Sequence, residues 1–224
     1  MHAERSSPAM IPILFETPDV LAVNKPEGIP SIPAAASEHG SLVELLGTAL
    51  GEKLFVVHRL DRDTSGVVLL ARNAAAHRSL NEQFSSHKVR KSYLAVVHGV
   101  PATRRGQINL PLREFGSGRM GVDLQRGKPA TTLYQLIESL ETNYALLEVS
   151  PLTGRRHQIR VHLYSIGHPV VGDLRYGDKA VQVAYPRLML HAQRIEFSLP
   201  SGERVAVEAP LPESFTSFLK QLRP

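Results

Sequence analysis

Short apolar segments with the periodicity of β-strands follow one another along this chain with only tight turns between many of them, and this restricts the fold more than any other feature. Examples are "FVVHRL" at residues 55–60 and "GVVLLAR" at 66–72, and two hairpins are predicted at 131–151 and 186–210. Turns can join antiparallel neighbours, whereas parallel strands need longer crossovers. The sequence therefore predicts an α+β fold with a mixed, largely antiparallel sheet flanked by helices, and not a doubly wound fold.

Four helices are expected between these strands, at residues 41–50, 74–87, 153–167 and 212–223. Ser41 is the predicted N-cap of the first helix, and Thr153 and Gly167 are the predicted start and end of the third. The two hairpins are expected to turn at residues 141–143 and 200–202.

The organisation along the chain is that of one globular domain at residues 13–224, preceded by a loose polar tail at 1–12. The segment 104–128 is long, rich in glycine and arginine, and without clear periodicity. We expect it to be irregular and to become ordered on a bound polyanion.

Composition gives a weak indication of partners. The formal net charge is +5 and the pI is about 9.6, which favours nucleic acid or an acidic membrane surface. The absence of cysteine excludes disulfides, thiolate metal sites and a cysteine nucleophile. No secretory h-region opens the chain, and no stretch approaches the ~18 apolar residues of a membrane helix. We expect a cytoplasmic protein with no membrane association.

The stretch "HRLDRDTSG" at residues 58–66 places Asp61 and Asp63 among arginines, just before a buried strand. Three interpretations are open. The carboxylates lie on a surface turn, or one is a phosphatase nucleophile, or one attacks the sugar of a nucleotide.

The stretch "TGRRHQIRVH" at residues 153–162 forms the second cluster. On a helix Arg156 and Arg160 share one face, and Ile159 and Leu163 share the buried one. Either the arginines form a solvated basic face, or one of them reaches inward to a carboxylate and favours its ionised form. The histidines of this stretch, His157 and His162, are five residues apart with no glutamate between them, which argues against zinc and favours surface groups or RNA contacts.

A third group lies in "HKVRKSY" at residues 87–93. Lys88, Arg90 and Lys91 could follow phosphates. Tyr93 could offer its ring to a base, although an ordinary strand tyrosine is the simpler interpretation of that residue alone.

Together these motifs resemble those of the RluA-type pseudouridine synthases, a family that isomerises uridine in ribosomal or transfer RNA. The matching pieces occur in the family's order between about residues 19 and 210, and they are "NKPEG", "HRLDRDTSGVVLLAR", "KSYLAVVHG", "GKPATTLY", "PLTGRRHQIRVHLYSIGHPVVGD" and "RLMLHA". The resemblance implies a bilobed sheet with a central cleft.

The resemblance also implies roles for individual residues. Asp61 is the expected nucleophile and Arg160 its partner, and Arg59 is expected to enter the RNA where the target uridine leaves the stack. Tyr93 is expected to contact the everted base, with Leu190 beneath it and Ile159 beside it.

Conversion of uridine to pseudouridine neither oxidises nor adds a group, so neither a cofactor nor a metal is expected. Asp61 could attack ribose C1′ and form an acylal, or take the 2′-proton and lead to a glycal. Many relatives carry an N-terminal S4 module, for which about fifteen residues leave no room here. We therefore expect the catalytic domain alone to bind tRNA or rRNA. Separately, we assume a monomer.

Two other functions compete with this interpretation. "DRDT" at residues 61–64 matches the two aspartates of the D-x-D-x-T pattern of haloacid-dehalogenase-type phosphatases, and "GDLRYGD" at 172–178 loosely resembles their acidic metal-binding segment. However, His58 and Arg59 interrupt the strand that this pattern requires. A non-catalytic RNA-binding protein is the second competitor, although a carboxylate at Asp61 would repel phosphates and gain such a protein nothing.

Overall fold

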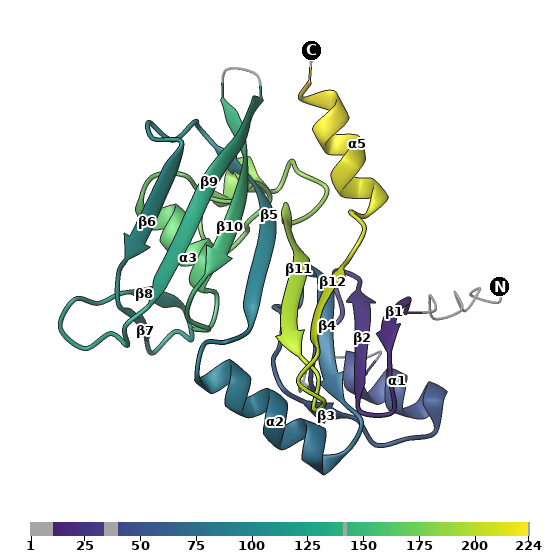
Figure 1. The fold of residues 1–224 in the computed structure, drawn as a ribbon. Coiled ribbons are helices and arrows are strands. Elements are labelled where there is room, and N and C mark those ends of the chain that lie inside the picture. The colour runs from purple at the N-terminus through teal and green to yellow at the C-terminus, as the bar shows by residue number, and fades with distance from the viewer. Residues whose placement is uncertain (1–10, 34–39, 141–142, 224) are drawn as a thin grey trace.

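The computed structural model describes residues 11–33, 40–140 and 143–223. Within them one large sheet has the strand order β1-β2-β4-β11-β5-β10-β9-β6, with β12 paired to β11 and β3 to β4 (Figure 1). Its strands are β1 (Ile13–Glu16), β2 (Val20–Lys25), β3 (Phe55–Val56), β4 (Ser65–Ala71), β5 (Arg90–His98), β6 (Arg105–Asn109), β9 (Thr131–Leu140), β10 (Tyr144–Pro151), β11 (Leu190–Ser198) and β12 (Arg204–Glu208).

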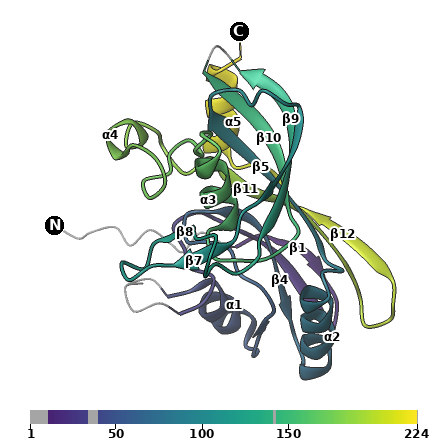
Figure 2. The same ribbon diagram turned by 90° about the vertical axis from the view of Figure 1, so that its left-hand side faces the viewer.

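A separate two-stranded ribbon pairs β7 (Leu112–Glu114) with β8 (Met120–Val122). The helices are α1 (Leu42–Leu50), α2 (Ala74–Ser85), α3 (Gln158–Ser165), α4 (Lys179–Gln182) and α5 (Glu213–Gln221). Figure 2 shows α3 on the same side of the sheet as the β7–β8 ribbon. None of the helices in the described residues is both long enough and apolar enough to cross a bilayer.

Two hydrophobic cores lie along the sheet and confirm the predicted α+β class. One core packs α1 and α2 against β2 and β4, and the other packs α3 and α5 against β5, β9 and β10. Tyr93 of β5 contacts both cores. The sheet is mixed as predicted, because β4 and β11 are parallel while the other named pairs are antiparallel.

Strand β4 is buried along its whole length, which explains its continuous apolar sequence. It approaches β11 very closely at Gly66, whose φ is +117°. A Cβ atom at Gly66 would lie 2.3 Å from the backbone oxygen of Ala192. Glycine therefore follows Thr64-Ser65 because no side chain fits between the two strands there.

The helix boundaries agree with the sequence at α1, α2 and α5 and differ at α3. Ser41 caps α1 in a capping box with Glu44, as predicted for Ser41. Helix α3 begins at Gln158, not at Thr153, so the predicted start was wrong. The Thr153 hydroxyl instead donates to the Gln158 side chain and accepts from the Thr131 amide, which ties the loop to β9.

The segment 104–128 was expected to be irregular, and this expectation was wrong. It contains β6, which pairs with β9, and the β7–β8 ribbon, which packs on α3. The short strands and frequent glycines hid the alternation. The predicted tail at 1–12 lies almost wholly outside the described residues, as does most of the predicted turn at 141–143.

Candidate active site

A cavity of about 610 Å³ lies where β4, β5 and β11 meet α3, and all six residues expected at the site line it. Arg59 and Asp61 come from the loop before β4, Tyr93 from β5, and Leu190 from the start of β11, with Ile159 and Arg160 on α3. Because β4 and β11 are parallel, their N-terminal ends lie at the same edge of the sheet. Residue 190 pairs with Ala95 of β5, which brings the third strand to this point.

The Asp61 carboxylate is held by Arg160. Nη1 of Arg160 donates to Oδ2 of Asp61 at 3.0 Å, while Nε and Nη2 donate to Asp173 at 2.7 and 2.8 Å. The Asp173 side chain is fully buried, that of Arg160 is 7% exposed, and that of Asp61 is 20% exposed toward the cavity. Burial opposes the charge of Arg160, but Asp173 and then Asp61 raise the pKa of the guanidinium. One arginine therefore joins a buried anchor to an accessible carboxylate.

Asp173 was not predicted as a site residue, although it lies in the segment 172–178 that loosely resembles the metal-binding segment of phosphatases. Its Oδ1 also accepts the backbone amides of Arg175 and Tyr176. The carboxylate is thus fully engaged as the anchor of Arg160. The position of Asp173 at the end of the long motif "PLTGRRHQIRVHLYSIGHPVVGD" was the available signal.

His157 is a second residue whose role the sequence did not reveal. It precedes α3 with φ of +53°, a left-handed conformation that non-glycine residues rarely adopt. Its Nδ1 lies 2.8 Å from the Tyr176 hydroxyl, which accepts the Met120 amide, and its Nε2 faces Oδ1 of Asp61 at 3.8 Å. Burial lowers the pKa of His157 to about 4, against the opposing charge of Asp61, so the ring is neutral at neutral pH.

The expectation that His157 and His162 are helix-surface groups was therefore wrong, whereas the alternative of an RNA contact stays a prediction for His157, which lines the cavity. The side chain of His157 is 10% exposed, and His162 is fully buried and bonded to Thr132 and the Leu110 carbonyl. Helix α3 is covered by the sheet on one side and the β7–β8 ribbon on the other, so most of its surface is internal. Arg155 and Arg156 lie before the helix and are exposed, whereas Arg160 turns inward.

The far wall of the cavity is apolar and aromatic. Ile159 and Leu190 are 6% and 3% exposed, so each presents only an edge to the cavity. Burial, followed by the charge of Asp61, raises the pKa of Tyr93 above its usual range, so the hydroxyl stays neutral. Burial also lowers the pKa of Lys91, which lines the same cavity. Arg59 is exposed at the entrance.

Hydrogen bonds from Lys25 and to His58 fix the loop that carries Asp61. Lys25 is fully buried, and its Nζ donates to the carbonyls of Pro26, Ile29 and Arg62 at 2.8–3.0 Å. Three acceptors need three N–H donors, which only the ammonium form supplies. His58 accepts the Leu69 amide and stacks on Phe84, and burial lowers its pKa to about 3. Both residues are structural supports of the loop.

The acidic residues do not form a metal site of the phosphatase kind. Among residues 11–33, 40–140 and 143–223 no three histidine, aspartate or glutamate side chains are placed to share an ion. Asp173, the candidate from the segment 172–178, is occupied by Arg160.

Comparison with known proteins agrees with this geometry. Residues 19–165 match the family model of RNA pseudouridylate synthases. The chain is 36% identical over 216 residues to the dual-specificity RNA pseudouridine synthase RluA of Escherichia coli K12, covering 94% of this chain and 99% of that one. It is 41% identical over 223 residues to ribosomal large subunit pseudouridine synthase C of Pasteurella multocida, covering 94% of this chain and 68% of that one.

The same relationship holds among solved structures. Human RNA pseudouridylate synthase domain containing 1 superposes with a TM-score of 0.79 at 32% identity, covering 94% of this chain and 87% of that one. Human RNA pseudouridylate synthase domain containing 4 gives a TM-score of 0.77 at 29% identity. Sequence, fold and site thus agree, and the chain belongs to the RNA pseudouridylate synthase family, as a member of the RluA type.

Proposed function

We propose that this RNA pseudouridine synthase isomerises uridines in tRNA or large-subunit rRNA, with Asp61 as the group that acts on the ribose. The single observation that carries the assignment is the unequal binding of the Asp61 oxygens. Oδ2 is held by Arg160 at 3.0 Å, while Oδ1 lies on the side of His157 in a cavity wide enough for a nucleoside. The names of relatives that act on the large ribosomal subunit, or that have dual specificity, support this choice of RNA.

The first step is extraction of the nucleotide, which costs a few kcal/mol in lost stacking and pairing. In the proposal the exposed guanidinium of Arg59 fills the vacated position. The base then lies against Tyr93, Ile159 and Leu190, and a base stacked on an aromatic ring recovers on the order of 1–3 kcal/mol.

Two chemical routes are compatible with Asp61. In the acylal route Oδ1 bonds to C1′ as the C1′–N1 bond breaks, and the electron pair leaves with the base. The base turns, C5 bonds to C1′, and the Asp61–C1′ bond breaks. In the glycal route Asp61 instead removes the proton on C2′ as the C1′–N1 bond breaks, which leaves a C1′=C2′ double bond. When C5 bonds to C1′, that proton returns to C2′. In both routes C5 finally loses a proton and N1 gains one, so no external oxidant or reductant is required.

Tyr93 takes part in the proposal as a neutral hydroxyl. Because burial raises its pKa, the phenolate needed to remove the C5 proton is not populated at neutral pH. Tyr93 therefore serves as a stacking surface and a hydrogen-bonding group for the base, and the C5 proton passes to Asp61 or to water.

The test compares wild type with Asp61→Asn on unmodified transcripts of tRNA and of large-subunit rRNA, with pseudouridine mapped by chemical sequencing. We expect loss of isomerisation with RNA affinity within about tenfold of wild type, because the substitution removes the charge but keeps the shape. A variant that still forms pseudouridine would overturn the role of Asp61. Failure of wild type on every transcript would overturn the choice of RNA.

The proposal also takes residues 13–224 as one catalytic domain acting in the cytoplasm as a monomer, without cofactor or metal. Turnover should survive exhaustive chelation of divalent ions, in contrast to a phosphatase of the D-x-D-x-T kind. Light scattering tests the monomer.

A further inference from the structure

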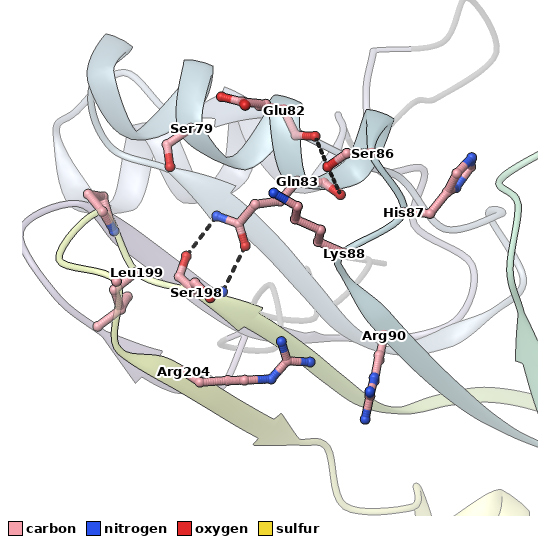
Figure 3. Close-up of a pocket in the computed structure, with 12 residues that line it drawn as sticks. Ser79, Glu82, Gln83, Ser86, His87, Lys88, Arg90, Ser198, Leu199 and Arg204 are labelled. Carbon is pink, nitrogen blue, oxygen red and sulfur yellow. Dashed lines mark hydrogen bonds between the residues drawn. The ribbon is translucent and has the colours of Figure 1, made fainter.

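A second groove, of about 500 Å³, lies outside the catalytic cavity, between the end of α2 and the β11–β12 hairpin. Lys88 and Arg90 contribute from the segment that enters β5, and Arg204 contributes from β12, as Figure 3 shows. All three side chains are exposed. We call this surface the basic groove. Neither the family's motifs nor the mechanism above uses it.

The floor of the basic groove is fixed by Gln83 of α2. Its amide nitrogen donates to the Ser198 carbonyl at 2.9 Å, and its amide oxygen accepts the Ser198 amide at 2.8 Å (Figure 3). This reciprocal pair joins the helix to β11 in the way that a neighbouring strand would. The position of α2 relative to β11, and with it the shape of the groove, is therefore fixed by hydrogen bonds.

The cations of the groove are only partly neutralised. Within the described part of the chain no carboxylate forms an ion pair with Lys88 or Arg90, and the Glu196 contact of Arg204 is 3.4 Å long. Glu82, the one acidic residue lining the groove, lies on the α2 side. Fixed cations without close counterions attract a polyanion, and an RNA backbone supplies one negative charge per nucleotide.

The basic groove adjoins the catalytic cavity along the segment 87–91. Val89 and Lys91 line the catalytic cavity, Lys88 and Arg90 line the groove, and His87 lines both. At the start of β5 successive side chains point to opposite sides, so Arg90 faces the groove while Lys91 faces the catalytic cavity. An RNA strand that leaves the catalytic cavity past His87 would therefore enter the basic groove directly.

We propose that the basic groove binds the phosphate backbone of the RNA strand that continues from the target uridine, through Lys88, Arg90 and Arg204. This inference rests on the proposed function, which places the target uridine of that RNA strand in the catalytic cavity. The groove would contact the RNA backbone without reading the bases. It would enlarge the RNA-binding surface beyond the nucleotides in the catalytic cavity.

The test measures binding, without turnover, of fluorescein-labelled oligouridylates of about four and about twenty nucleotides, lengths that bracket a short and an extended single-strand site. The variant carries Lys88→Gln, Arg90→Gln and Arg204→Gln. The matched control carries Lys53→Gln, Lys179→Gln and Lys220→Gln, which removes the same charge from exposed positions outside both cavities. Circular dichroism checks the fold of each.

We expect the groove variant to bind the long oligouridylate at least about tenfold more weakly, with the slope of log Kd against log salt smaller by about 2, since each lost phosphate contact on a single strand lowers that slope by about 0.7. Binding of the short oligouridylate and binding by the control should change little. Unchanged binding of the long RNA would overturn the inference, as would equal losses for short and long RNA or for variant and control. Because the assay needs no isomerisation, its result is independent of the role of Asp61.

Discussion

Arg160 and Asp61 lie 3.0 Å apart although 99 residues separate them in the chain. The guanidinium reaches Asp61 with one nitrogen while two others are held by the buried Asp173. Asp173 thus sets the position of Arg160, and Arg160 sets that of Asp61. Arg160 thus makes one contact with a buried anchor and one with the carboxylate that we propose acts on the ribose, and mutation can separate these two contacts.

Arg160→Met is expected to lose turnover and also to destabilise the fold, because the Asp173 charge remains buried without its partner. Breaking a buried pair in this way costs about 3–5 kcal/mol of unfolding free energy. The double variant Arg160→Met, Asp173→Asn should recover most of that loss in urea unfolding, since an asparagine oxygen can still accept the Arg175 and Tyr176 amides. Turnover should stay lost in both. Restored turnover in the double variant would contradict the role of Arg160 beside Asp61.

His157→Ala is expected to lower kcat by about a hundredfold while RNA affinity stays near that of wild type, because a shift of about 1 Å in a reacting group has an effect of that size. The physical reason is that the His157 ring lies beside Oδ1 of Asp61, so its removal lets the carboxylate move. Tyr176→Phe, which removes the hydroxyl that holds Nδ1 of His157, should lower kcat in the same direction and by less. Single-turnover kinetics with saturating enzyme measure both. A change in affinity alone would assign His157 to RNA binding instead.

Gly66→Ala is expected to lower the free energy of unfolding by about 3 kcal/mol or more, because the new methyl group meets the Ala192 backbone and the φ of +117° is strained. Gly28→Ala is the matched control. Gly28 also has a positive φ, +83°, but a Cβ there meets nothing within 4 Å, so only about 1 kcal/mol of backbone strain is expected. Equal losses in urea unfolding would show that close contact with β11 is not the cause.

Stability is expected to fall as pH decreases below about 6.5, and His191 contributes to this. Burial lowers its pKa to about 4 in the folded protein, while in the unfolded chain the pKa is the ordinary histidine value of about 6.5. The unfolded state therefore binds more protons between these values, and the stabilisation present above pH 6.5 is lost as pH falls toward 4. His58 and His157 act in the same direction.

Urea unfolding at several pH values checks this prediction. His191→Asn keeps an acceptor for the Ser65 hydroxyl but cannot titrate. It should reduce the slope of unfolding free energy against pH, by at most ~1.4 kcal/mol per pH unit. An unchanged slope would show that His191 is charged in the folded state as well.

Local sequence signals were sufficient for most elements of the fold. Ser41 was identifiable as an N-cap because a capping box needs only residues three apart, and the hairpin turning at residues 200–202 because a short turn specifies its neighbours. The start of α3 was not identifiable, because the Thr153 hydroxyl accepts a hydrogen bond from the Thr131 amide of β9 and caps no amide of α3. Strands β7 and β8 were missed because three residues are too few to show a period.

The candidate site divides in the same way. Asp61, Arg160 and Tyr93 stood out through their motifs, but the exposure of His157 and the partner of Asp173 could not be inferred. His157 follows two arginines in a polar run, and only the tertiary contact with Tyr176 shows how its ring is covered. The basic groove also depends on packing, since residues 88 and 90 meet residue 204 only through the pairing of β11 with β5 and β12.

Local sequence signals predicted the class of fold and the motifs whose residues line the catalytic cavity. These depend on periodicity, turn chemistry and side-chain type, which are local properties. Which charges meet, by contrast, depends on the tertiary arrangement, because burial and strand order are set by the whole chain. The anchoring of Arg160 by Asp173, the neutral state of His157 and the two adjoining cavities all follow from that arrangement.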